Sequence, residues 1–249
     1  MYMVYFGPDT ASIVQTWLNF SEKKCHRIHV GTRKEGECKE IKAHDKIIDD
    51  SEKEKYVGDI VSNNGKPDYN ISARRAKGFG IASNILSILD EILIGSHRIE
   101  AGLCMREGML LIGILTNSDV WIGLNENHYK ELEQVDEFLL RGILKAHSKG
   151  PIESLYLETG TIPIRYIIKQ RRINYLHHLI TRKSEELINK VYLAQKRKPC
   201  RNDWATVVDK DKCDISLNLS ANEMKSMKKN KFKTYLKKKI RVSAFNYLK

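Results

Sequence analysis

The stretch NISARRAKGFGIASNILSILDEILI, residues 70–94, decides the fold class of this chain. Its apolar residues recur at helical spacing: Ile81, Ile85, Ile88 and Ile92, widened by Leu86, Leu89 and Leu93. This period is typical of an amphipathic helix that packs one stripe against a core. Gly95 is suited to end the helix, because glycine readily adopts the left-handed conformation found after helix C-termini.

Two more amphipathic patterns follow and predict helices from about Ile99 to Trp121 and from about Asn127 to His147. Their expected core positions are Leu103, Leu110, Leu111, Ile114 and Leu115 in the first, and Leu132, Val135, Leu139 and Ile143 in the second. Because short connections join the three helices, residues 66–150 are expected to form a compact bundle.

Residues 151–249 are also predicted to be helical. Helix starts are indicated at Pro151, Pro163, Ser184, Asp203 and Ala221. Ser220-Ala221-Asn222-Glu223 fits a capping box, which opens a lysine-rich helix or helix pair ending near Leu248. Gly160 is expected to end the first of these helices.

The first 65 residues carry mixed signals. A short helical stretch over residues 11–20 precedes an alternating strand over residues 25–30, and Glu54–Val61 predicts another strand that ends at the turn Asn63-Asn64-Gly65. The expected fold is therefore mainly α with a small α+β N-terminal part. The expected domains are residues 1–65, 66–150 and 151–249.

The positive charge is concentrated at one end of the chain. The net charge is +12, yet residues 1–150 hold 20 Lys and Arg against 22 Asp and Glu, and residues 221–249 hold ten against one. A clustered excess of one sign favours a polyanion partner over an ordinary solvated face. Five cysteines without a CxxC motif indicate reduced thiols and a nuclear or cytoplasmic location. No apolar run is long enough for a bilayer, so no membrane partner is expected.

The motifs that suggest catalysis are weak. The spacing of four residues resembles that of a small zinc site: Cys25, His29, Cys38 and His44. The first two lie in an alternating strand, however, without the tight glycine turns of such sites. The pair Asp49-Asp50 lies in a charged loop, so a solvated turn is favoured over two-metal catalysis. Gly78-Phe79-Gly80 lacks a third glycine and a preceding strand, which favours close helix packing over nucleotide binding.

Basic residues are the better functional candidates. The expected nucleic-acid-binding set is Arg74, Lys77, Arg165, Lys169, Arg171, Arg172, Lys228, Lys229, Lys231, Lys233, Lys237, Lys238, Lys239 and Arg241. Lysine supplies charge to phosphates without the planar fork that reads bases. The interleaved Phe232, Tyr235 and Ile240 have near-helical spacing, which favours core contacts over base stacking. His177-His178 is expected to be an ordinary packed or surface pair.

Several segments together resemble one family. They are Leu18–Cys25, the Lys-Tyr-Val-Gly of residues 55–58, Asn117–Trp121, Leu132-Glu133 with Asp136, and Pro151–Arg172. In combination the chain resembles, over most of residues 17–249, the C-terminal part of a non-LTR retrotransposon reverse transcriptase, an RNA-directed DNA polymerase of the type with a C-terminal restriction-like endonuclease. The resemblance implies palm-edge strands, a three-helix thumb and a basic post-thumb linker.

The resemblance also implies roles and gaps. It places Lys24 near the incoming nucleotide and makes Tyr56, Val57 and Gly58 the primer grip, where leucine is commoner than Val57. The Tyr-x-Asp-Asp motif, the other catalytic aspartate, the fingers and the endonuclease residues are missing from this sequence. The chain alone is therefore expected not to polymerise, and Mg²⁺ is expected only in the complete polymerase. The missing palm and fingers portion becomes a possible partner.

Three functions remain open from the sequence. The first is a transposable-element fragment that binds RNA or an RNA–DNA hybrid, for which removal of residues 221–249 should flatten the salt dependence of binding. The second is a stand-alone helical interaction module that uses the stripe Ile81–Ile92 as a partner groove or a dimer seam. The third is a small metal-dependent enzyme built on Cys25, His29 and nearby carboxylates.

Overall fold

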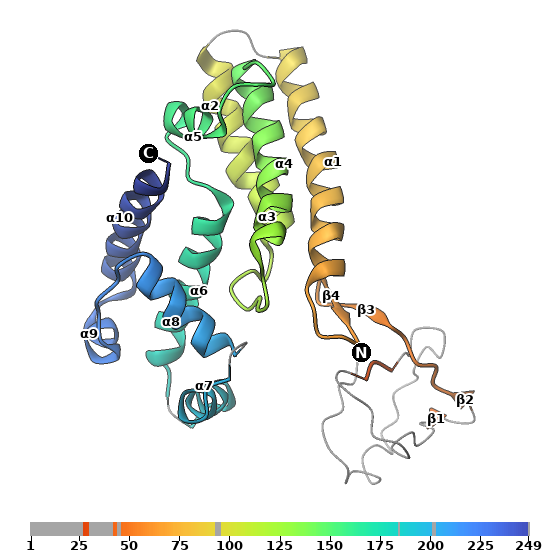
Figure 1. Cartoon of the computed structure of the whole chain (residues 1–249), viewed down its shortest axis with the longest axis vertical. Helices are drawn as coiled ribbons and strands as arrows, with labels where there is room; N and C mark the ends of the chain where they lie inside the picture. The colour runs from red at the N-terminus through yellow and green to blue at the C-terminus, as the bar shows by residue number, and fades with distance from the viewer. Residues whose placement is uncertain are drawn as a thin grey trace. The chain divides into compact units, whose positions relative to one another are not determined.

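The computed structural model describes residues 27–29, 42–43, 46–92, 96–183, 185–200 and 203–248. It is mainly helical, with short antiparallel strand pairs near the N-terminus (Figure 1), which confirms the predicted fold class at that level. The chain divides into two compact units, residues 1–70 and 71–249. The expected segments 66–150 and 151–249 therefore fall almost entirely within one unit.

Residues 53–62 form a β-hairpin, so the single strand expected over Glu54–Val61 is wrong. Strand β3 (Lys53–Tyr56) pairs antiparallel with β4 (Asp59–Ser62). Val57 and Gly58 make the turn with φ angles of 48° and 89°, and positive φ at both central residues is the geometry of a tight two-residue hairpin. The sequence hides this turn because a β-branched residue rarely adopts positive φ.

The rest of the first unit is described in part. Strand β1 (Lys42–Ala43) pairs with β2 (Lys46–Ile47), and Arg27 forms a parallel bridge and an ion pair with Asp50. The expected turn after the hairpin is confirmed, since Gly65 donates its N–H to the Ser62 carbonyl at 3.0 Å. The helix expected over residues 11–20 and most of the strand expected over residues 25–30 lie outside the described residues.

The second unit begins with the three expected helices, whose ends are shifted. They are α1 (Asp68–Ile92), the run of α2 (Ser96–Met105), the π-helix η2 (Arg106–Leu110) and α3 (Leu111–Leu115), and α4 (Glu126–Leu144). The middle run ends at Leu115 instead of Trp121, because the chain turns at Asn117 with a φ of 62°. Helix α4 begins at a capping box in which Asn125 Oδ1 accepts from the His128 N–H at 3.0 Å.

The buried stripe of α1 shares Ile85 and Leu89 with the predicted one and differs from it elsewhere. Ile71, Ala82, Ile85 and Leu89 are fully buried, whereas Ile81 and Ile88 lie at its margin. Most of the core residues predicted for the second and third helices are confirmed, since Leu110, Leu111, Ile114, Leu115, Leu132, Val135, Leu139 and Ile143 are buried. Leu103 of α2 is only half-buried.

The later helices are α5 (Ile152–Thr159), α6 (Ile164–Ile180), α7 (Leu187–Arg197), α8 (Trp204–Asp214), α9 (Ala221–Ser226) and α10 (Lys229–Tyr247). Four of the five later predicted helix starts agree with the structure to within one residue. The start expected at Ser184, which lies outside the described residues, is wrong, because α7 begins at Leu187 with Glu186 as its N-cap. The capping box at Ser220 is confirmed, with Ser220 Oγ accepting from the Glu223 N–H at 3.2 Å. Gly160 ends α5 with a φ of 62°. The lysine-rich end is a helix pair.

Helix α6 belongs to two hydrophobic cores. Ile164 and Ile168, near its start, pack into the core formed by α1, η2, α3 and α4. Ile173, Leu176 and Leu179 pack into a second core with residues of α8, α9 and α10. Figure 1 shows α6 between these two groups of helices. Leu140, Leu155, Tyr156 and Leu248 form a third, smaller cluster that joins α4 and α5 to the residue after α10.

We predict that Gly78→Ala lowers the free energy of unfolding by about 1 to 3 kcal/mol, because overpacking a tight crossing is costly. A Cβ at Gly78 would lie 2.8 Å from Val135 Cγ1 and 2.9 Å from Ile114 Cγ2. Gly80→Ala is the matched control, since a Cβ there meets nothing within 4 Å. The control should stabilise the helix by up to about 1 kcal/mol. Urea denaturation of both variants checks this, and equal effects would contradict the proposed tight crossing.

Candidate nucleic-acid interface

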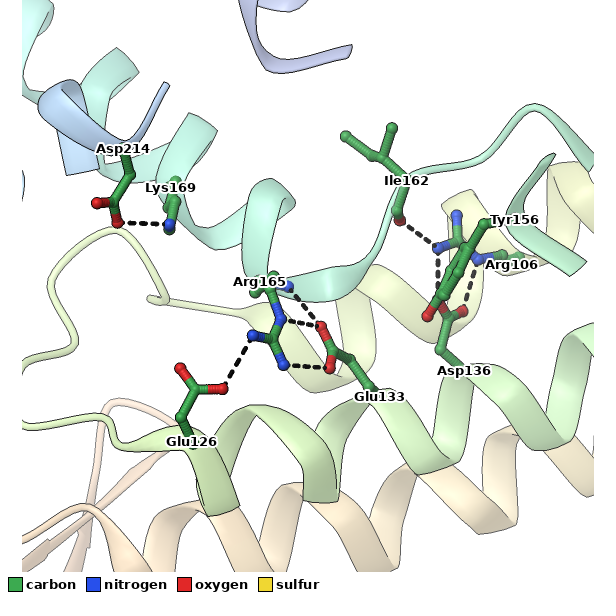
Figure 2. A network of polar contacts seen from close by, with 9 residues as sticks. All are labelled: Arg106, Glu126, Glu133, Asp136, Tyr156, Ile162, Arg165, Lys169 and Asp214. Carbon is green, nitrogen blue, oxygen red and sulfur yellow. Dashed lines mark hydrogen bonds and ion pairs between the residues drawn. The ribbon is translucent and has the colours of Figure 1, made fainter. Parts of the chain in front are cut away.

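The basic residues of α6 bind acidic partners within the protein. The guanidinium of Arg165 forms a bidentate pair with Glu133 of α4, from Nε at 2.8 Å and Nη2 at 2.9 Å, and Nη1 reaches Glu126 at 2.9 Å (Figure 2). Hydrogen bonding to Glu133 raises the pKa of Arg165 although partial burial opposes it. Arg165 therefore joins α6 to α4 and has little charge to offer a ligand.

Two more cations of α6 pair with α8. Lys169 Nζ lies 2.7 Å from Asp214 Oδ2, and Arg172 Nη1 lies 3.1 Å from Asp211 Oδ2. The Arg172 side chain is only 1% exposed and also donates to the Tyr129 hydroxyl at 3.4 Å. Burial raises the pKa of Asp211, and the charge of Arg172 opposes this shift. Both pairs fix α6 against α8.

Arg171 and Arg74 bind backbone oxygens around the end of α3. Arg171 donates to the Leu115 carbonyl, and burial lowers its pKa. Arg74 of α1 is buried and donates to the carbonyls of Gly113 at 3.1 Å and Thr116 at 3.3 Å. These groups complete hydrogen bonding where a helix ends, because terminal carbonyls lack partners within their own helix.

The sequence-based assignment is thus corrected for five residues: Arg74, Arg165, Lys169, Arg171 and Arg172. Their side chains are buried or largely buried and hold helices together, so we remove them from the candidate interface. Lys77 stays, because it is exposed on α1. Counting charges along the sequence could not separate internally paired cations from exposed ones, because the acidic partners of α6 lie some 30 to 45 positions away.

A buried polar group near the π-helix was not predicted. Arg106 donates to both carboxylate oxygens of Asp136, at 2.6 and 2.7 Å, and to the Ile162 carbonyl at 3.3 Å (Figure 2). The Tyr156 hydroxyl donates to Asp136 at 3.2 Å, and burial raises the pKa of Tyr156. Every contact is internal, so this group positions η2, α4 and the chain before α6. Arg106 and Asp136 lie 30 positions apart on two predicted helices, so no local pattern in the sequence indicated the pair.

Helix α10 differs from α6 in that its cations face solvent. Phe232, Leu236, Ile240 and Ala244, every fourth residue, are fully buried in the second core. The exposed cations around them are Lys228, Lys229, Lys231, Lys233, Lys237, Lys238 and Arg241, with Lys239 half-buried. Within the described part of the chain, none of the ion pairs involves one of these groups. We call these eight residues the α10 basic face.

Tyr235 is half-buried, so the expected core role of the aromatic residues holds for Phe232 and in part for Tyr235. His177 is buried, its Nε2 donates to the Met227 carbonyl oxygen at 3.1 Å, and its ring stacks on the Phe232 ring with 4.2 Å between centroids. His177 therefore anchors the start of α10. His178 is exposed beside it, which fits the expected packed and surface pair.

The remaining candidates lie in the first unit. Tyr56 and Val57 are exposed at the tip of the hairpin, with Val57 68% exposed. Lys24 lies outside the described residues, as do Cys25, Cys38 and His44. Among the residues that are described, no three His, Cys, Asp or Glu side chains are grouped to hold a metal ion. No helix in the described ranges is long and apolar enough to cross a bilayer.

Comparison of the chain with protein-family models, with curated proteins and with solved structures found no match. The site is therefore interpreted from its own chemistry. A helix face with eight cations and no carboxylate can neutralise several phosphates along a strand, and its binding energy would depend on salt. Lysines dominate this face, so it favours contact with the backbone over reading of bases.

We predict that Arg172→Met lowers the free energy of unfolding by about 3 to 5 kcal/mol, because it leaves Asp211 buried without its counter-ion. The deficit should shrink as the pH falls through the raised pKa of Asp211, since protonation removes the unpaired charge. Arg182→Gln is the control, because its pair with Glu186 is exposed and is worth less than about 1 kcal/mol. Urea denaturation at several pH values measures the free energy of unfolding of both variants. If Arg172→Met lowers it by no more than Arg182→Gln does, the buried Arg172–Asp211 pair does not stabilise the fold as proposed.

Proposed function

We propose that this chain is part of a non-LTR retroelement reverse transcriptase and that its helical portion binds RNA or an RNA–DNA hybrid along the phosphates. In this proposal α1, the α2–α3 run and α4 are the thumb, which lies against the minor groove. The segment from α5 onward is the post-thumb linker, and the α10 basic face supplies its electrostatic attraction. The catalytic carboxylates and their Mg²⁺ would belong to the missing palm.

The observation that carries the proposal is the contrast between α6 and α10. Both helices are rich in basic residues, but the cations of α6 are paired with carboxylates or carbonyls inside the protein. The α10 basic face keeps its charge at the surface. A one-signed exposed face costs stability through self-repulsion, so a polyanion that neutralises it would be bound favourably.

The hairpin adds a second, independent observation for the primer-grip assignment. Val57 is an exposed β-branched residue in the left-handed region, where an L-residue is strained by about 1 to 2 kcal/mol. Strained, exposed residues often contact ligands. Tyr56 and Gly58 flank it at the tip, so all three would contact the primer strand together.

The interaction-module alternative must use a different surface from the one expected. Ile85 and Leu89 of the stripe Ile81–Ile92 are fully buried in the first core, so that stripe is not an open groove. Exposed apolar side chains instead lie on α7, where Leu187 is 77% and Val191 50% exposed. A protein partner on α7 would bind without the salt dependence of a phosphate contact.

A salt titration with a charge-neutralised variant tests the proposal. Deletion of residues 221–249 is unsuitable, because it would remove Phe232, Leu236 and Ile240 from the second core. We expect Lys231→Gln/Lys237→Gln/Lys238→Gln to keep the fold and reduce the magnitude of the slope of log K against log salt by about 2 to 3. Binding to a short RNA–DNA hybrid, followed by fluorescence anisotropy, gives the slope.

The matched control removes three exposed lysines elsewhere: Lys130→Gln/Lys149→Gln/Lys190→Gln. It has the same net charge as the test variant and should keep the wild-type slope within about 1. Equal slope changes in the two variants would mean that net charge alone attracts the nucleic acid. No binding of the wild type at low salt would overturn the proposed function.

We predict that Val57→Asn stabilises the hairpin yet weakens binding of the hybrid several-fold. Asparagine adopts positive φ more readily than valine and, before glycine, is favoured in this turn. The loss of an apolar contact should nevertheless reduce affinity by about three- to tenfold, which corresponds to about 1 kcal/mol. Hydrogen exchange of residues 53–62 and anisotropy measure the two effects. Affinity that stays the same or rises would contradict the primer-grip assignment.

A further inference from the structure

Helix α7 turns its polar side toward the protein and its apolar side toward solvent. The helix lies against α8 and α6 (Figure 1). Asn189 is only 6% exposed and donates its Nδ2 to the Lys183 carbonyl at 2.7 Å, and Gln195 Oε1 accepts from the Ala205 N–H at 3.3 Å. One side of α7 is therefore anchored to the protein largely through polar contacts.

The opposite side of α7 is an aliphatic stripe. Leu187, Val191 and Ala194 follow one another at i, i+4 and i+7, so they share one face of the helix. All three are exposed, Leu187 by 77% and Val191 by 50%, and Ile188 adds a further exposed side chain at the margin. A helix of a globular protein normally buries such a stripe against its own core. The inverted orientation of α7 therefore indicates that another molecule covers the stripe.

The cations of α7 divide between the same two sides. Lys196, on the anchored side, pairs with Asp209 of α8 at 2.6 Å. Lys190 and Arg197 lie seven residues apart along one edge of the stripe, and both are exposed. Neither forms an ion pair with any residue that the structure describes. Because α7 itself contains no Asp or Glu, the edge of the stripe is complementary to a surface with carboxylates.

This combination of charge and apolar surface selects among the possible occupants. An antiparallel second copy of α7 would bring Lys190 and Arg197 against the same two cations, and like charges at a helix edge are destabilising. A nucleic-acid strand stacks on aromatic side chains, and the stripe has none. A membrane-surface helix commonly presents Trp or Phe to the lipid, but the single aromatic residue of α7, Tyr192, packs against the Trp204 ring at 6.2 Å between centroids.

We propose that the α7 stripe and its basic edge bind an amphipathic helix of another protein. The partner helix would place aliphatic side chains against Leu187 and Val191 and carboxylates against Lys190 and Arg197. The inference goes beyond the proposed function, because it gives the chain a protein partner on a surface other than the α10 basic face. The contact is short, about 16 Å for the 11 residues of α7, so we expect an affinity in the micromolar range.

Two designed peptides test the proposal with the full-length chain. Both are helical and about three heptads long, with leucine at the a and d positions, and they differ in having either glutamate or lysine at e and g. We expect the glutamate peptide to bind at least tenfold more tightly than the lysine peptide, as measured by fluorescence anisotropy of the labelled peptides. Equal affinities, or no binding of the glutamate peptide, would overturn the proposal.

A first pair of variants tests the aliphatic stripe. Leu187→Gln/Val191→Gln should weaken binding of the glutamate peptide at least tenfold. The matched control, Met109→Gln/Ile112→Gln, replaces two apolar side chains that are 44% and 58% exposed elsewhere in the unit and should keep the affinity within twofold. Both variants should fold, because surface substitutions rarely cost much stability. Equal losses in the two variants would count against α7 as the binding site.

A second pair of variants tests the basic edge. Lys190→Glu/Arg197→Glu should reverse the preference, so that the lysine peptide becomes the tighter ligand. Lys231→Glu/Lys238→Glu makes the same change of net charge on the α10 basic face and should retain the preference for the glutamate peptide. If the preference shifts equally in both variants, net charge alone attracts the peptide and the proposed site is wrong.

Two further measurements would identify a different occupant. Sedimentation equilibrium that finds a wild-type dimer and a monomeric Leu187→Gln/Val191→Gln variant would show that a second copy covers the stripe. Phosphatidylserine vesicles that bind the wild type and not this variant would show that a lipid surface does. Either result would overturn the helix partner. Neither bears on the proposed function, because Leu187→Gln/Val191→Gln should leave the salt slope of hybrid binding unchanged.

Discussion

The arrangement of residues 71–249 depends on one constraint, which is that α6 is buried on two sides at once. Its first half packs against the α1–α4 core and its second half against α8 and α10. A helix with two packed sides has little surface left for water, so its charged groups need partners inside the protein. Glu126 and Glu133 supply them from α4, and Asp211 and Asp214 from α8.

This pairing determines where the net charge of the chain can act. The carboxylates of α4 and α8 form ion pairs with the cations of α6, so they do not neutralise the lysines of α10. Helix α10 can expose its cations because its other side is a complete apolar stripe that holds it to the second core. A large part of the positive excess of the sequence thus lies on one anchored helix face.

The sequence predicted those features that depend on nearby residues. Helix α4 and its core positions followed from local periodicity, and the Ser220 box followed from residues three apart. The burial and ion pairing of Arg172 could not be predicted, because they depend on Asp211 in a later helix. The hairpin was missed because Val57 adopts a backbone conformation that valine normally avoids.

The third cluster has a consequence for the order of folding. Leu248 packs with Leu140, Leu155 and Tyr156, so this cluster joins residues about a hundred positions apart in the sequence. Contacts between distant residues form late, because a long loop must close first. During synthesis, Leu140, Leu155 and Tyr156 leave the ribosome long before Leu248 does, so the surface that Leu248 covers stays exposed until the residues after α10 are complete. A nascent chain stalled before that point would keep an exposed hydrophobic surface, which chaperones bind.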